Sequence, residues 1–125
     1  MKKILTIAAI SGMLAVILGA FGAHGLKKIL TPEMLEVFKT GVQYQFYHTF
    51  ALLAVGILMY FSESKSLKWS ANMFIVGIVL FSGSLYALAI SGIKILGAIT
   101  PLGGVAFIVG WILLAVYASK QIHSK

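Results

Sequence analysis

Two histidines beside long apolar runs are the side chains with the most chemistry to offer in this sequence. His24 follows the first run, and His48 lies close to Tyr44 and Gln45 at the start of the second. Neutral imidazole is a ligand for zinc, copper or iron, and it titrates near neutral pH, which suits proton transfer. A metal site and acid–base catalysis are therefore the first functions to consider.

The residues that would complete either kind of site are scarce. The chain has no cysteine, and only Glu33 or Glu36 would be near enough to complete a set of ligands, so a metal site is disfavoured and none is expected. No nucleophile, paired carboxylate or cofactor motif accompanies His48, and we expect neither catalytic residues nor a cofactor. The interpretation we favour is hydrogen bonding between helices; ligand binding is the functional alternative.

The polar side chains lie at matching ends of successive apolar runs. Tyr44, Gln45 and His48 share one side of a helix by three- and four-residue spacing. If the runs are antiparallel membrane spans, their outer ends meet in one layer. We therefore predict a polar cluster near the outer face, made of His24, Tyr44, Gln45, His48, Ser84, Tyr86 and Thr100.

The composition indicates that the elements holding these side chains are membrane helices. The chain has 125 residues, which suits one domain, and 60% of them are hydrophobic against 10% charged. The mean hydropathy is +1.01, outside the range of soluble globular proteins. Ten lysines against three glutamates give a net charge of +7, but they are scattered at the ends of apolar runs. We expect membrane lipids as partners rather than nucleic acid.

Four apolar runs, residues 4–22, 44–61, 69–91 and 101–119, approach or reach the length that crosses about 30 Å of hydrocarbon. Thr31-Pro-Glu33 indicates a helix start, with Thr31 as the N-cap. Residues 32–43 have the two-sided pattern of an interfacial amphipathic helix. The predicted fold is an all-α integral membrane protein, a bundle of four transmembrane helices with an interfacial helix before the second span.

Two segments leave alternatives open. Residues 92–100 contain Gly92 and Gly97 and end near a second Thr-Pro pair, so they are either an irregular wall of a site or an ordinary hairpin turn before a helix that starts near Ile95. The first span has the basic start and small-residue ending of a secretory signal. We expect it to remain as a span, because it is long for a signal core.

Small residues recur at positions where helices could approach closely. Those chosen as packing residues are Gly12, Ala15, Gly19, Gly83, Gly103 and Gly104. Small residues of this kind let transmembrane helices pack with their backbones in contact. We expect the chain to associate with itself or with a partner membrane protein through such faces.

The distribution of lysines favours one orientation in a cell (inner or plasma) membrane. Four spans put both termini on one side, together with Lys2, Lys3, Lys65, Lys68, Lys120 and Lys125. The other side carries Lys27, Lys28, Lys39 and Lys94. The positive-inside rule then predicts cytoplasmic termini.

Four motifs in this order resemble a known family. They are Gly19-Ala-Phe-Gly-Ala-His-Gly25, Gly41-Val-Gln-Tyr-Gln-Phe-Tyr-His48, Phe81-Ser-Gly-Ser-Leu-Tyr86 and Leu96-Gly-Ala-Ile-Thr-Pro-Leu-Gly-Gly104. Together they look like the small bacterial inner-membrane proteins catalogued as domain of unknown function 423, to which a small eukaryotic transmembrane family is similar. The resemblance covers essentially the whole chain and implies a four-span membrane protein. It supplies no reaction and no catalytic residues.

The leading hypothesis is a non-enzymatic membrane protein whose polar cluster binds a small amphiphile, such as a lipid, or a partner helix. A small transporter or channel is the alternative from another class. It requires water-accessible polar groups through the full depth of the membrane, and the inner halves of these spans are apolar. An accessory subunit of a larger membrane complex is the third hypothesis.

Overall fold

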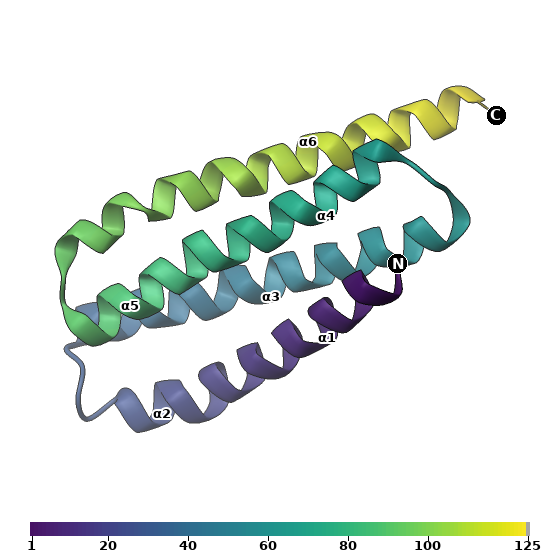
Figure 1. The fold of residues 1–125 in the computed structure, drawn as a ribbon. Coiled ribbons are helices and arrows are strands. Elements are labelled where there is room, and N and C mark those ends of the chain that lie inside the picture. Colours follow the sequence, from purple (N-terminus) through teal and green to yellow (C-terminus); the bar gives the residue numbers. More distant parts are fainter. Residues whose placement is uncertain (125) are drawn as a thin grey trace.

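The chain folds into helical rods laid side by side, as Figure 1 shows for this computed structural model. It describes residues 1–124, with side chains described through Lys120. The first rod joins α1 (Lys2–Val16), the π-helical segment η1 (Ile17–Gly22) and α2 (Ala23–Leu26). All regular elements within residues 1–124 are helical, as predicted.

The second rod is α3 (Pro32–Phe61), a single helix of 30 residues. Thr31 caps it, because its Oγ1 accepts a hydrogen bond from the Met34 amide at 3.1 Å, and Pro32 occupies the first helical position. This start was predicted and is confirmed. The helix runs unbroken through residues 32–43, and the interfacial location of that part stays a prediction.

The third rod joins α4 (Lys65–Gly77), the π-helical segment η2 (Ile78–Ser82) and α5 (Gly83–Ser91). Ser64 caps α4 by accepting a hydrogen bond from the Leu67 amide at 3.4 Å. Gly92 ends α5 with a φ of 71°, a left-handed conformation that glycine adopts without a steric penalty.

The fourth rod is α6 (Thr100–Ser124), preceded by the short 3₁₀ helix η3 (Lys94–Ala98). Residues 91–95, which include Gly92 and Ile93, are exposed. The segment before α6 is a turn at one end of the molecule that contains this 3₁₀ helix (Figure 1). The long helix begins at Thr100, one residue before Pro101.

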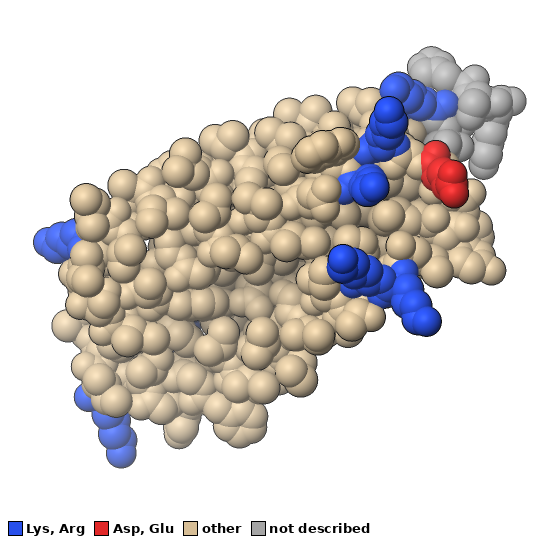
Figure 2. Space-filling model, viewed as in Figure 1, with Lys and Arg blue, Asp and Glu red and all other residues tan. Residues whose placement is uncertain are grey.

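Four helical stretches are long and apolar enough to cross a membrane: Lys2–Leu26, Pro32–Phe61, Lys65–Ser91 and Lys94–Lys120. The two chain ends lie at the same end of the molecule (Figure 1). In the view of Figure 2, lysines gather at the two ends of the molecule, and the band between them is uncharged. This distribution fits a bilayer around the middle of the helices.

The rods pack in an open order rather than as a closed ring. α1 packs on α3, α3 packs on α4 and α5, and α6 packs on α4 and η2. One core cluster of buried side chains joins α1, α3, α4 and α6 and includes Leu52, Val55, Phe74 and Phe107. A smaller cluster around Phe38 and Ala89 joins α3 to α5. The first rod thus lies at an edge, held mainly by α3 (Figure 1).

Candidate functional site

His48 lies where α3 meets α4 and α6, and aromatic rings enclose it. Its ring stacks on Phe107 with ring centroids 3.4 Å apart and planes 6° from parallel. Trp111 donates its indole N–H to His48 Nε2 at 3.1 Å. On the other side of the ring, His48 Nδ1 lies 2.8 Å from the Tyr44 carbonyl oxygen.

These partners fix the form of the imidazole. An indole nitrogen can only donate, so His48 Nε2 accepts, and Nδ1 carries the hydrogen that it donates to the Tyr44 carbonyl. The side chain is 5% exposed. Both ring nitrogens are thus occupied within the protein, and neither has a free lone pair for a metal or a proton.

Gln45, one turn before Thr49 on α3, is the centre of a second polar group. Tyr86 of α5 donates its hydroxyl to Gln45 Oε1 at 2.5 Å. Gln45 Nε2 donates to the Ser11 carbonyl oxygen at 2.9 Å and lies 3.3 Å from Ser11 Oγ. Ser11 Oγ and Thr49 Oγ1 are 2.8 Å apart. We call Ser11, Gln45, Thr49 and Tyr86 the glutamine network; it ties α1, α3 and α5 together.

Ser84 and Thr100 form a third and smaller pair, between α5 and α6. Ser84 donates its hydroxyl to the Phe81 carbonyl oxygen at 2.9 Å. The Ser84 and Thr100 hydroxyl oxygens are 2.6 Å apart, so Thr100 donates to Ser84. The pair fixes the start of α6 against the third rod.

The structure therefore divides the predicted polar cluster into separate groups. Tyr44 lies with His48, Gln45 with Tyr86, and Ser84 with Thr100. His24 is exposed on α2, and within the described residues its side chain makes no hydrogen bond. Within the residues that the structure describes, no three His, Cys, Asp or Glu side chains lie close enough together to hold a metal ion. Ligand binding by any of these residues stays a prediction.

Sequence reasoning missed several partners of the cluster. Ser11 and Thr49 complete the glutamine network, and Phe107 and Trp111 complete the surroundings of His48. One usable signal was Trp111, because it falls in the middle of the fourth apolar run. An indole far from the membrane surface needs a hydrogen-bond acceptor.

The small residues that were predicted to let helices pack closely differ in their surroundings. Ala15 is fully buried, and a Cβ added at Gly19 would lie 3.0 Å from Val42 of α3. A Cβ added at Gly103 would overlap the backbone of Phe81, so α6 and the third rod touch there. The other three have looser surroundings: Gly12, Gly83 and Gly104.

A lateral groove opens between α1 and the third rod, where the glutamine network reaches the side of the molecule. Its volume is about 210 Å³, and it is lined by Ile7, Ile10, Ser11, Leu14, Gln45, Ile75, Ile78 and Val79. Ser11 and Gln45 are buried and form its floor, while the walls are aliphatic. No buried side-chain nitrogen or oxygen within the described residues lacks a hydrogen-bond partner.

Comparison with known proteins identifies relatives along nearly the whole chain. A sequence model of the family described as "Protein of unknown function (DUF423)" matches residues 18–104. The UPF0382 membrane protein YwdK of Bacillus subtilis is 50% identical over 98% of this chain and 100% of its own length. A UPF0382 membrane protein of Haemophilus influenzae is 48% identical over 96% of both chains.

A further relative carries a more specific name. The UPF0382 inner membrane protein YgdD of Escherichia coli is 44% identical over 95% of this chain and 91% of its own length. No solved structure matches the chain. The identities and coverage, with four helices able to span a bilayer, show that this membrane protein belongs to the DUF423 (UPF0382) family.

Proposed function

We propose that the protein is a non-enzymatic membrane protein that binds a membrane amphiphile, with an acyl chain held in the groove between α1 and the third rod. The groove itself is the observation that carries this proposal. Its walls are branched aliphatic side chains, such as Ile10 and Val79, that stay exposed at the side of the helices. An acyl chain fits such a surface, because it offers methylene contacts and requires no hydrogen bond.

The polar residues support a structural role beside that site. Ser11 and Gln45 at the groove floor are already bonded to each other, and His48 uses both ring nitrogens within the protein. Hydrogen bonds of this kind between membrane helices stabilise a bundle by about 0.6 kcal/mol each on average. The predicted polar cluster then holds the helices that form the groove and leaves the ligand to the aliphatic walls.

A second copy or a partner helix is the competing occupant of the groove. An α-helix with its side chains is about 10 Å or more across. A groove of about 210 Å³ is small for such an element and suits a single flexible chain. We therefore favour a lipid, in a cell membrane and with the chain termini on the cytoplasmic side.

The test is a substitution that fills the groove. Val79→Trp places an indole on its wall, and Val105→Trp is the matched control on α6, where the valine is similarly exposed. If the indole weakens binding of the acyl chain by about 1.4 kcal/mol, lipid retention falls about tenfold. Native mass spectrometry of protein released from lipid nanodiscs measures the retained lipid, and Val105→Trp should match the wild type.

Equal lipid retention in the two tryptophan variants contradicts the proposal. So does a dimer whose copies cross-link through cysteines placed at Ile10 and Val79, because that result assigns the groove to a second chain. If Val79→Trp fails to fold, Ile10→Trp fills the same groove from the opposite wall.

A further inference from the structure

We propose that the amphiphile is an anionic phospholipid from the leaflet at the chain termini, with its head group in a hollow edged by Lys65 and Lys68. This inference rests on the proposed acyl-chain groove and adds the class of lipid that enters it. Three observations carry it: the hollow, the charge at that end, and the alignment of the hollow with the groove.

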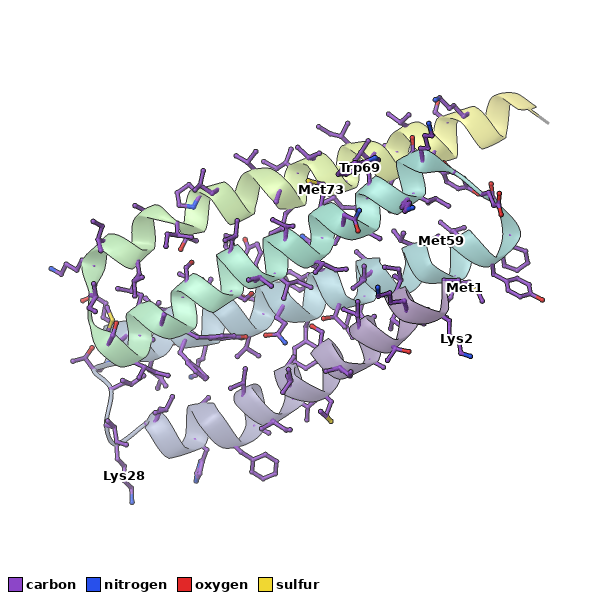
Figure 3. All side chains as sticks on the ribbon, in the orientation of Figure 1. Met1, Lys2, Lys28, Met59, Trp69 and Met73 are labelled. Carbon is purple, nitrogen blue, oxygen red and sulfur yellow. The ribbon has the colours of Figure 1, made fainter. Side chains whose placement is uncertain are left out.

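The hollow lies at the end of the molecule that holds the termini, beside the turn between α3 and α4. Its volume is about 530 Å³, and it is lined by Met1, Met59, Ser62, Glu63, Ser64, Lys65 and Lys68. Met1 and Met59 are labelled side by side at this end in Figure 3. A hollow lined by serine hydroxyls, lysines and methionines suits a head group joined to an acyl chain.

The charge at this end favours an anion. Lys65 and Lys68 are both exposed, and Glu63 is the one carboxylate among the lining residues. At the opposite end, Lys39 lies 4.0 Å from Glu36 in an ion pair. Figure 2 shows several further lysines around the end that holds the hollow, and Figure 3 labels Lys2 there. Clustered lysines at a membrane surface attract anionic lipids.

Met1, just before α1, and Lys65 and Lys68 of α4 line the hollow, and the groove is lined by residues further along α1 and the third rod. α1 and α4 both begin at this end and run in the same direction (Figure 1). By spacing of four, three and four residues, one face of the first rod carries Lys3, Ile7, Ile10 and Leu14. The same spacing on the third rod gives a face with Lys68, Asn72, Ile75 and Val79.

Each face thus starts with a lysine and continues along the groove wall. Eleven residues separate Lys68 from Val79, which is about 16 Å at 1.5 Å per residue, about half of a 30 Å hydrocarbon core. The distance along the third rod from Lys68 to Val79 therefore matches the depth of a single leaflet. A lipid with its phosphate at the lysines would lay its chain in the groove.

Asn72 supplies a polar group at the depth where a lipid has its ester carbonyls. It lies one helical turn beyond Lys68, and its side chain is partly exposed. Within the part of the chain that the structure describes, its amide makes no hydrogen bond to protein. An amide next to hydrocarbon is costly without a partner, and an ester carbonyl accepts its N–H.

Selection among lipids must come from the head group. Acyl chains in the bilayer are as apolar as the groove walls, so the groove alone discriminates little between lipids. Each lysine near the head group favours an anionic lipid about fivefold. We therefore expect phosphatidylglycerol to be enriched over phosphatidylcholine with identical acyl chains.

The test reconstitutes the full chain in nanodiscs with equal amounts of those two lipids and measures their ratio on the released protein by native mass spectrometry. Lys65→Gln/Lys68→Gln should lower the phosphatidylglycerol enrichment about 25-fold while total retained lipid stays constant. Lys27→Gln/Lys28→Gln at the other end is the matched control and should keep the enrichment. Equal ratios in wild type and in Lys65→Gln/Lys68→Gln overturn the inference.

The Val79→Trp variant separates this inference from the proposed function. Loss of both lipids from Val79→Trp, with a changed ratio in the lysine variant, supports both proposals. Full lipid retention by Val79→Trp overturns the groove as the binding site, and therefore this inference too, even if the lysine variant changes the ratio. Loss of both lipids from Val79→Trp with no change in the lysine variant keeps the groove and rejects the anionic head group.

Discussion

The two sides of α3 are built in different ways. Toward α4 and α6, His48 is enclosed by Phe74, Phe107 and Trp111, and the space between the helices is filled with rings. Toward α1, aliphatic and small side chains such as Ile4 and Ala8 pack on α3, Ser11 and Gln45 add hydrogen bonds, and a groove lies beside them. One side is filled with aromatic rings, and the other combines aliphatic packing with a polar network and is open to a groove.

This difference suggests separate roles: the α6 side stabilises the fold, and the α1 side provides the binding groove. Rings in close contact make many weak attractions that add up, so the α6 side should contribute most of the free energy of unfolding. The hydrogen bonds of the glutamine network add to the apolar packing of α1 on α3 and leave the groove next to it open. An edge helix held in this way leaves room for a lipid, and the predictions below test that division.

The largest effect is expected from His48→Ala. The change removes a buried ring that stacks on Phe107 and leaves the Trp111 indole N–H without its acceptor. We expect a loss of about 3 kcal/mol, as for other large-to-small core substitutions. His24→Ala, at an exposed position, should stay within about 0.5 kcal/mol. Denaturant titration followed by circular dichroism measures both, and equal losses would break the comparison.

A smaller loss is expected from Gly103→Ala. The added methyl group overlaps the backbone of Phe81, where α6 contacts the third rod, so the helices must move apart. Overpacking of this kind costs about 1–3 kcal/mol. Gly83→Ala is the matched control, since a Cβ there meets no atom within 4 Å. The same titration should separate the two variants, and a tolerated Gly103→Ala would show that this side is less tightly closed than described.

The smallest effect is expected on the α1 side, from Gln45→Leu. The change removes the bonds to Ser11 and Tyr86 but keeps a side chain of similar size. Two interhelical hydrogen bonds at about 0.6 kcal/mol each give a loss of about 1 kcal/mol. Gln43→Leu, at an exposed position on the same helix, should change little. A loss as large as that of His48→Ala would mean that both sides of α3 carry similar weight.

The fold class could be predicted from the sequence, because each signal for it lies within a single segment of the chain. Apolar run lengths predicted four helices able to span a bilayer, and the Thr31-Pro32 pair predicted where α3 begins. Each of these signals depends on residues within one segment. Hydropathy and capping chemistry can therefore be interpreted without knowledge of the neighbouring helices.

The candidate site was less accessible, because it depends on which helices touch. Spacing placed Tyr44 and His48 on one face but could not show that Trp111 of α6 faces them. His24 was grouped with His48 because both lie at matching ends of successive spans, and the open order of helices leaves His24 exposed. The groove is a gap between α1 and the third rod, and no single segment carries a signal for it.

The π-helical segments have a consequence for insertions and deletions. An α-helix turns about 100° per residue, so gaining or losing one residue rotates everything beyond it. A π-helical turn takes an additional residue into a wider loop of backbone. Ile17–Gly22 and Ile78–Ser82 are therefore the places where these two rods can change length by one residue while the faces on either side keep their partners.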